Sequence, residues 1–204
     1  DGGGLDLAFL GLAQADREGN LNVSKFGPRL AGAGGFINIS QSAKSVVFVG
    51  TFTAGDLQLG LDNGRLKLIS DIGPRKFVES VEHRTFSGGE AIRRKQPVLY
   101  VTERCVLRLG ADGMELIEVA PGVDIERDVL ARMDFKPIIR RDPVLMDAAI
   151  FAAEPMNLRQ RMLAVPLAQR LEFGERHARG GVAMGGPLDE VEGARQAEAG
   201  GSMH

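Results

Sequence analysis

The sequence is poor in the residues that build disulfide and metal frameworks, with one cysteine and three histidines in 204 residues. The single cysteine, Cys105, excludes an internal disulfide framework and suits a reducing compartment, so we expect a cytoplasmic protein. The histidines lie far apart, which argues against a metal site. No apolar run approaches the length of a membrane-spanning helix. The formal net charge of −2 favours neither a nucleic acid nor an anionic membrane as a partner.

The length and composition are those of one ordinary globular domain. Hydrophobic residues make up 44% of the chain and charged residues 25%. The chain begins with Asp1 instead of Met and has no visible signal peptide, so we interpret it as a piece of a longer protein. Residues 174–204 are rich in glycine and contain no Phe, Tyr or Ile. Such a composition buries little apolar surface, which predicts a folded domain over residues 1–173 and a disordered tail over 174–204.

Hydrophobic periodicity predicts several short strands and a few short helices. Residues 45–52, SVVFVGTF, are apolar on both faces, as in a strand buried inside a covered sheet. In residues 57–70, leucines alternate on both sides of Asp-Asn-Gly, which is typical of a tight hairpin. Further strands are predicted at residues 21–26, 76–86, 97–109 and 114–120. Helices are predicted at residues 36–44, at 125–133 after a capping Asp124, and at 158–163.

The stretch GPRLAGAGGFINIS, residues 27–40, places four glycines just before a predicted helix. A glycine loop that enters a helix can hold a phosphate or an oxyanion with its free backbone amides. Two well-known signatures fail here. The dinucleotide fingerprint has Ile37 in place of its third glycine, and the phosphate loop has Ala33 in place of its lysine. From spacing alone, a binding loop and a tight turn where backbones pack closely are equally supported.

Other candidate residues have weaker signals. Cys105 is interpreted as a buried strand cysteine. Glu103 has the chemistry of an acid or a base, but a polar residue on a solvated strand face explains it better. Farther along the same stretch, Cys105, Leu107 and Leu109 share one face and Arg104 and Arg108 the other. The basic run 92–97, IRRKQP, is typical of a solvated loop. Lys44 is either a surface lysine or a phosphate ligand, should the glycine loop bind a nucleotide-bearing molecule.

Several long stretches, in order and nearly without gaps from Asp1 to about Leu171, resemble the family I coenzyme A transferases. The resemblance is closest to the single-chain branch that acts on acetate, propionate and 3-ketoacids. Beyond EPMNLRQRMLAVPLAQRLEF the family continues with a strand-bearing segment, whereas this chain has its glycine-rich tail. The stretches that carry the resemblance are DGGGLDLAFLGLAQAD, GNLNVSKFGPRLAGAGGFINISQSAKSVVFVGTFTAGDL, YVTERCVLRL and ELIEVAPGVDIERDVLARMDFKPII.

The resemblance implies an α/β fold with an open mixed sheet flanked by helices, the C-terminal half of a CoA-transferase-like fold. It also implies a ping-pong reaction. In this family a glutamate attacks an acyl-CoA thioester and becomes a glutamyl-CoA thioester, which an acceptor carboxylate then resolves. That glutamate belongs to a Glu-Ser/Asn-Gly motif upstream of the segment matching DGGGLD. The motif does not occur in this chain, and Glu90 follows Ser-Gly-Gly instead. No catalytic residue is therefore assigned within the chain.

The resemblance also implies that the glycine loop lines the acyl-CoA site. The substrate-binding residues would then be Gly32, Ala33, Gly34, Gly35, Phe36 and Lys44, with Phe36 as a packing or acyl-pocket residue. Coenzyme A would be a substrate, and no cofactor or metal is implied. The expected partners are acyl-CoA, a short-chain carboxylate, the N-terminal portion of the same protein and further copies of it, with roles in short-chain fatty acid and ketone body metabolism. The alternatives are a non-catalytic module that binds CoA or a partner, and an acyl-CoA hydrolase on the same scaffold.

Overall fold

A computed structural model of the chain describes residues 4–169. The chain divides into two compact units, Asp1–Leu158 and Arg159–His204. In the second unit, the described residues form most of helix α3 (Leu158–Ala164), which confirms the helix predicted at 158–163. The predicted domain boundary at residue 173 and the predicted disordered tail over 174–204 lie outside the described residues.

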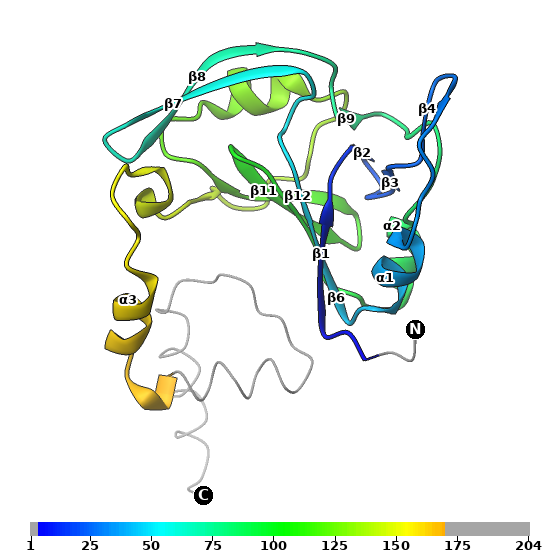
Figure 1. The fold of residues 1–204 in the computed structure, drawn as a ribbon. Helices are drawn as coiled ribbons and strands as arrows, with labels where there is room; N and C mark the ends of the chain where they lie inside the picture. Colours follow the sequence, from blue (N-terminus) through cyan, green and yellow to red (C-terminus); the bar gives the residue numbers. More distant parts are fainter. Residues whose placement is uncertain (1–3, 170–204) are drawn as a thin grey trace, which may run out of the picture. The chain divides into compact units, whose positions relative to one another are not determined.

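The first unit is built on a six-stranded mixed sheet, as predicted (Figure 1). Its order is β1 (Leu7–Gly11), β6 (Ser45–Val49), β10 (Val98–Val101), β11 (Cys105–Gly110), β12 (Gly113–Val119) and β13 (Val144–Leu145). Strands β1, β6 and β10 are parallel, β11 is antiparallel to both β10 and β12, and β13 is parallel to β12. The carboxyl ends of three parallel strands therefore meet along one edge.

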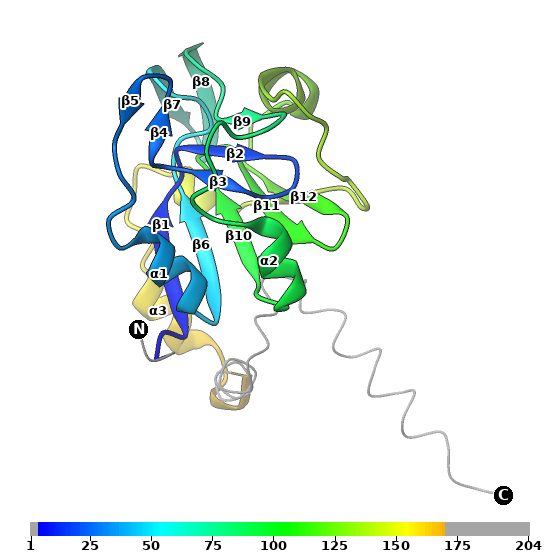
Figure 2. The same cartoon turned by 90° about the vertical axis from the view of Figure 1, so that its right-hand side faces the viewer.

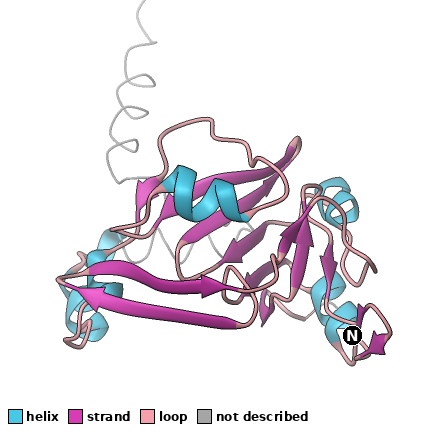
Figure 3. Ribbon diagram, turned by 90° about the horizontal axis from the view of Figure 1, so that it is seen from above, coloured by secondary structure: helices cyan, strands magenta, loops and turns pink. Residues whose placement is uncertain are grey.

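Helices α1 (Phe36–Ser42) and α2 (Gly88–Arg93) lie on the same side of the sheet (Figure 2). The core on this side includes Val46, Phe48 and Tyr100. The opposite side is covered in part by a long hairpin of β7 (Asp56–Asp62) and β8 (Arg65–Ile72) and by the 3-10 helix Ala148–Phe151 (Figure 3). Because Val47 belongs to this second core, β6 is buried on both faces, as its sequence predicts.

Short strands complete the unit and correct two predictions. A three-stranded sheet joins β2 (Gln14–Asp16), β3 (Leu21–Asn22) and β9 (Phe77–Val78), and a small hairpin joins β4 (Lys25–Phe26) and β5 (Arg29–Leu30). The strand predicted at 21–26 is thus two short strands. The strand predicted at 76–86 is wrong for residues 79–84, where hydrogen bonds run to side chains and loops. Only Phe86 returns to a strand, as an isolated antiparallel bridge to Leu21 of β3.

The strand predicted at 97–109 is two antiparallel strands joined by a turn. The hydroxyl of Thr102 accepts hydrogen bonds from the amides of Arg104 and Cys105 and so closes that turn. The predicted helix at 125–133 is a π-helical turn, Ile125–Val129, followed by a 3-10 turn, Leu130–Arg132. Asp124 caps it as predicted, since its carboxylate accepts from the amide of Arg127 at 2.8 Å.

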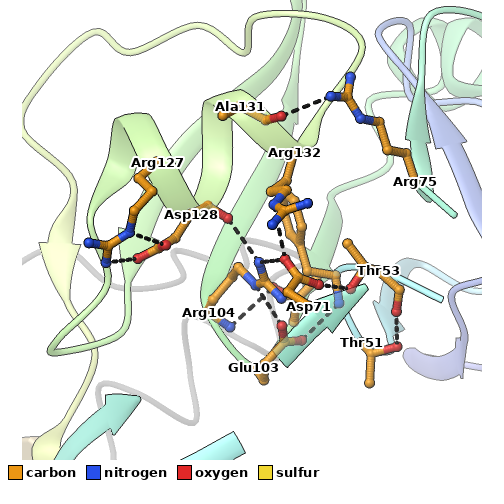
Figure 4. Close-up of polar contacts among 12 residues, drawn as sticks. Thr51, Thr53, Asp71, Arg75, Glu103, Arg104, Arg127, Asp128, Ala131 and Arg132 are labelled. Atoms are coloured by element: carbon orange, nitrogen blue, oxygen red, sulfur yellow. Dashed lines mark hydrogen bonds and ion pairs between the residues drawn. The ribbon is translucent and has the colours of Figure 1, made fainter. Parts of the chain in front are cut away.

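Arg104 does not lie on a solvated face, as its place in the sequence suggests, but is fully buried. Figure 4 shows acidic side chains gathered around its guanidinium. It pairs with Asp71 at 2.8 Å and Glu103 at 2.6 Å, and donates to the carbonyl of Asp128 at 2.9 Å. The guanidinium also lies over the ring of Phe52. The single cation of Arg104 thus joins three parts of the chain: strand β8 through Asp71, the turn between β10 and β11 through Glu103, and the π-helical turn through Asp128.

Burial alone would raise the pKa of Asp71. Hydrogen bonds from Arg104 and Thr53, and the charges of Arg104 and Arg132, outweigh it and hold that pKa below its ordinary value. The stability that the ionised carboxylate contributes is present above the unfolded-state pKa. It is lost as the pH falls through the lowered folded-state value.

We predict that Arg104→Met lowers the free energy of unfolding by about 3–5 kcal/mol, because it removes the counter-ion of the largely buried Glu103 and leaves the buried Asp71 with only the more distant Arg132, at 3.4 Å. Denaturant unfolding at neutral pH measures this. The matched control is Arg108→Met, which removes an arginine whose side chain is 50% exposed and pairs with Glu115. Its cost should stay below about 1 kcal/mol.

The free energies of unfolding of Arg104→Met and the wild type should become more similar in acid, because protonated carboxyls no longer need a counter-ion. Equal stabilities of the two proteins at neutral pH would contradict the role assigned to Arg104.

Candidate functional site

The glycine loop lies toward the carboxyl ends of the parallel strands. Helix α1 begins with Phe36, whose ring stacks on Phe48 near the end of β6, with ring centroids 5.7 Å apart. The helix then returns the chain to Ser45, where β6 begins. The loop before the helix is therefore directed to the edge of the sheet at which open α/β folds bind their ligands.

The conformation of the loop explains its glycines. Gly32 and Gly34 have φ values of 79° and 54°, a region that glycine enters without steric cost. A Cβ added at either position would meet no atom within 4 Å, whereas one at Gly88 would lie 2.1 Å from the carbonyl oxygen of Glu18. Close backbone packing therefore explains Gly88 but not the two loop glycines. Their surroundings are open.

Three consecutive amides of the loop are unbonded. Among residues 4–169, nothing accepts a hydrogen bond from the backbone N–H of Ala33, Gly34 or Gly35. The neighbouring amides of Ala31 and Gly32 are used, and both donate to the carbonyl of Ser24, at 2.8 and 3.1 Å. The loop is thus fixed by hydrogen bonds on the amino-terminal side of Ala33, and its next three amides are free to donate. Such an arrangement can hold an anionic or polarised oxygen.

Residues distant in sequence fix the amino-terminal side of the loop through hydrogen bonds. Ser24 is buried, and its hydroxyl lies 2.7 Å from Nδ1 of His83 and 2.9 Å from the hydroxyl of Thr85. The amide of Gly27 donates to the carboxylate of Glu82 at 2.7 Å. Sequence reasoning missed this support because it assigned residues 76–86 to a strand. The polar side chains crowded into that segment were the available signal.

The structure does not bring Lys44 to the loop. Lys44 follows the far end of α1, where its exposed ammonium pairs with Asp6 at 2.6 Å. Its predicted contact with a ligand phosphate stays a prediction without a supporting neighbour. Phe36 is half-buried and packs against the core beside Phe48, which agrees with the packing role predicted for it.

Three other polar residues singled out in the sequence all have protein partners. Glu103 is not solvated: its side chain is 14% exposed, and it accepts from the amide of Phe52 and from Arg104. Glu90 pairs with Arg93 on the surface of α2. In the basic run, Gln96 is buried and donates to two backbone carbonyls, although the cations before it are exposed, as predicted. Within residues 4–169, no group of three or more His, Cys, Asp or Glu side chains could hold a metal ion.

Cys105 is a fully buried strand cysteine, as predicted. Burial raises the pKa of its thiol to about 12, against an opposing hydrogen bond with Thr102. At about pH 8, roughly one thiol in ten thousand would then be a reactive thiolate.

We therefore predict that an aromatic disulfide reagent leaves Cys105 unmodified in the folded protein at about pH 8. The reagent should label it stoichiometrically once denaturant exposes the thiol. Absorbance of the released thiolate measures both. Labelling of the folded protein as fast as that of the unfolded chain would show that the thiol is accessible.

No family model matches the sequence, but individual proteins do. Caffeate CoA-transferase of Acetobacterium woodii is 48% identical over 157 residues, which are 74% of this chain and 30% of that protein. Acetate CoA-transferase YdiF of Escherichia coli K12 is 44% identical over 156 residues, 76% of this chain and 29% of that protein. A solved thioester complex of YdiF from E. coli O157:H7 with CoA superposes with a TM-score of 0.74 at 43% identity, covering 76% of this chain and 30% of that one.

The fold and its relatives place the chain in the class of CoA-transferase domains. Within that class, the chain belongs to the family I coenzyme A transferases. It spans about 30% of the length of the relatives it matches. None of the helices in the described part of the chain has the length and apolar character needed to cross a membrane.

Proposed function

We propose that the chain is the part of an acyl-CoA:carboxylate CoA-transferase that polarises the acyl-CoA thioester. The observation that carries the proposal is the row of free amides at Ala33, Gly34 and Gly35 on an anchored loop. The names of the relatives support it, since both transfer CoA, one to or from caffeate and the other acetate. The YdiF complex with CoA supports a thioester as the ligand.

In the proposed reaction, a glutamate carboxylate attacks the thioester carbonyl and CoA leaves as a thiolate. The thiolate then attacks the glutamyl carbonyl of the mixed anhydride, which releases the donor carboxylate and leaves a glutamyl-CoA thioester. An acceptor carboxylate reverses these steps. Each attack places negative charge on a carbonyl oxygen, which the loop amides would stabilise by hydrogen bonding.

We propose that the glutamate is supplied from outside these 204 residues, because the chain contains no Glu-Ser/Asn-Gly motif. The prediction is that the purified chain does not exchange CoA between acetyl-CoA and propionate, since losing a covalent nucleophile removes the reaction path itself. A version extended at its amino terminus by the sequence that carries the motif should restore exchange. Chromatographic detection of propionyl-CoA measures both. Enzyme-like turnover by the 204 residues alone would overturn the assignment.

The same assay separates the alternatives. An extended protein that releases free CoA without acyl exchange is a hydrolase. One that binds acyl-CoA without consuming it is a binding module.

A pair of matched glycine substitutions tests the loop in the extended protein. Gly34→Val should lower CoA exchange by about 10² to 10³-fold, because the strained valine displaces an amide and such a loss equals that of one oxyanion donor. Gly64→Val is the control, because Gly64 also has a positive φ, 75°, but lies in the turn between β7 and β8 and contributes nothing to the loop or its anchors. Each valine therefore imposes left-handed backbone strain at one turn. Both substitutions should lower the melting temperature, while only Gly34→Val loses turnover. Equal losses of turnover would make the loop structural.

A further inference from the structure

Lys76 bridges the carboxyl ends of two parallel strands. Its ammonium donates to the hydroxyl of Thr51 at 2.8 Å and to the carbonyl of Leu12 at 3.4 Å. Leu12 directly follows β1, and Thr51 is two residues beyond the end of β6. The backbone of Lys76 is itself fixed, since its carbonyl accepts from the amide of Ala15. A positive charge is thus held at the sheet edge toward which the glycine loop is directed.

The ammonium of Lys76 has no anionic partner within the described part of the chain. Lys25 and Lys44, by contrast, each pair with a carboxylate at an exposed position. Lys76 is half-buried, and burial lowers the pKa of its ammonium, while the charge of Glu103 opposes that shift. An anion beside the ammonium would offset the cost of burial.

Glu103 is not available as that anion. One of its carboxylate oxygens accepts from the amide of Phe52 at 2.8 Å, and the other from Arg104 at 2.6 Å. The hydroxyl of Thr51 is uncharged and already donates its proton to the carbonyl of Thr53 at 2.7 Å while it accepts from Lys76. It therefore does not neutralise the ammonium. An ammonium has three N–H donors. Two are used here, so one donor and a full charge remain.

We propose that Lys76 binds a carboxylate anion at the carboxyl ends of β1 and β6, with Thr51 as the residue that positions its ammonium. A single charge with one free donor suits a monoanion, whereas phosphate groups are usually held by several donors or by the fork of an arginine. The choice of a carboxylate rests on the proposed function, in which free carboxylates are substrates.

The experiment titrates the 204-residue chain with propionate and follows the side-chain Cε resonance of Lys76 by NMR after 13C-lysine labelling. Propionate should shift this resonance saturably and leave that of Lys67, an exposed hairpin lysine, unchanged. Lys76→Gln should weaken propionate binding by about tenfold or more, read from the line width of labelled propionate. The control Lys67→Gln should bind as the wild type does. Thr51→Val should weaken binding less than Lys76→Gln.

The proposal is overturned by an unperturbed Lys76 resonance, or by a folded Lys76→Gln variant with unchanged affinity. Inorganic phosphate that binds at Lys76 more tightly than propionate would also overturn it. Should Lys76→Gln fail to fold, the resonance shift in the wild type still decides. The assay needs neither CoA nor a nucleophile. Its failure is therefore distinguishable from a failure of the CoA-exchange assay.

Discussion

The buried guanidinium of Arg104 is the interaction on which the arrangement at the carboxyl end of the sheet depends. Its partner Glu103 holds the amide of Phe52, and its partner Asp71 bonds to Thr53. Both of these contacts fix the segment that follows β6. The carbonyl of Asp128 ties in the helical segment from the other side. The buried Nη2 atom of Arg104 has no hydrogen-bond partner among the described residues, so the cluster is not fully satisfied and part of its electrostatic gain is offset by desolvation.

The Arg104 cluster is connected to the candidate site by the segment after β6. Thr51 lies in this segment, and its hydroxyl orients the ammonium of Lys76. The glycine loop is held separately, by Ser24 and the residues that contact it. The two sets of donors at the sheet edge are therefore held by different side chains.

Local features of the fold could be predicted from the sequence because they depend on neighbouring residues. The alternating leucines on both sides of Asn63 and Gly64, the two-sided apolar run of β6 and the cap at Asp124 are examples. The burial of Arg104 could not be predicted, since its partner Asp71 is 33 residues away. In the site, the glycines were visible in the sequence. The unbonded amides, and the contact of Ser24 with His83 across 59 residues, depend on the folded chain.

The division between neutral and charged donors follows from what each would do in the proposed reaction. A full positive charge at the thioester carbonyl would bind free carboxylates tightly in the ground state and slow turnover. Backbone amides bind a neutral carbonyl weakly and an oxyanion strongly, so their contribution grows as charge develops. A carboxylate already carries its charge before reaction, and a lysine suits it. Uncharged amides on the glycine loop and a lone ammonium at Lys76 therefore match two different oxygens: one that becomes anionic, and one that is anionic from the start.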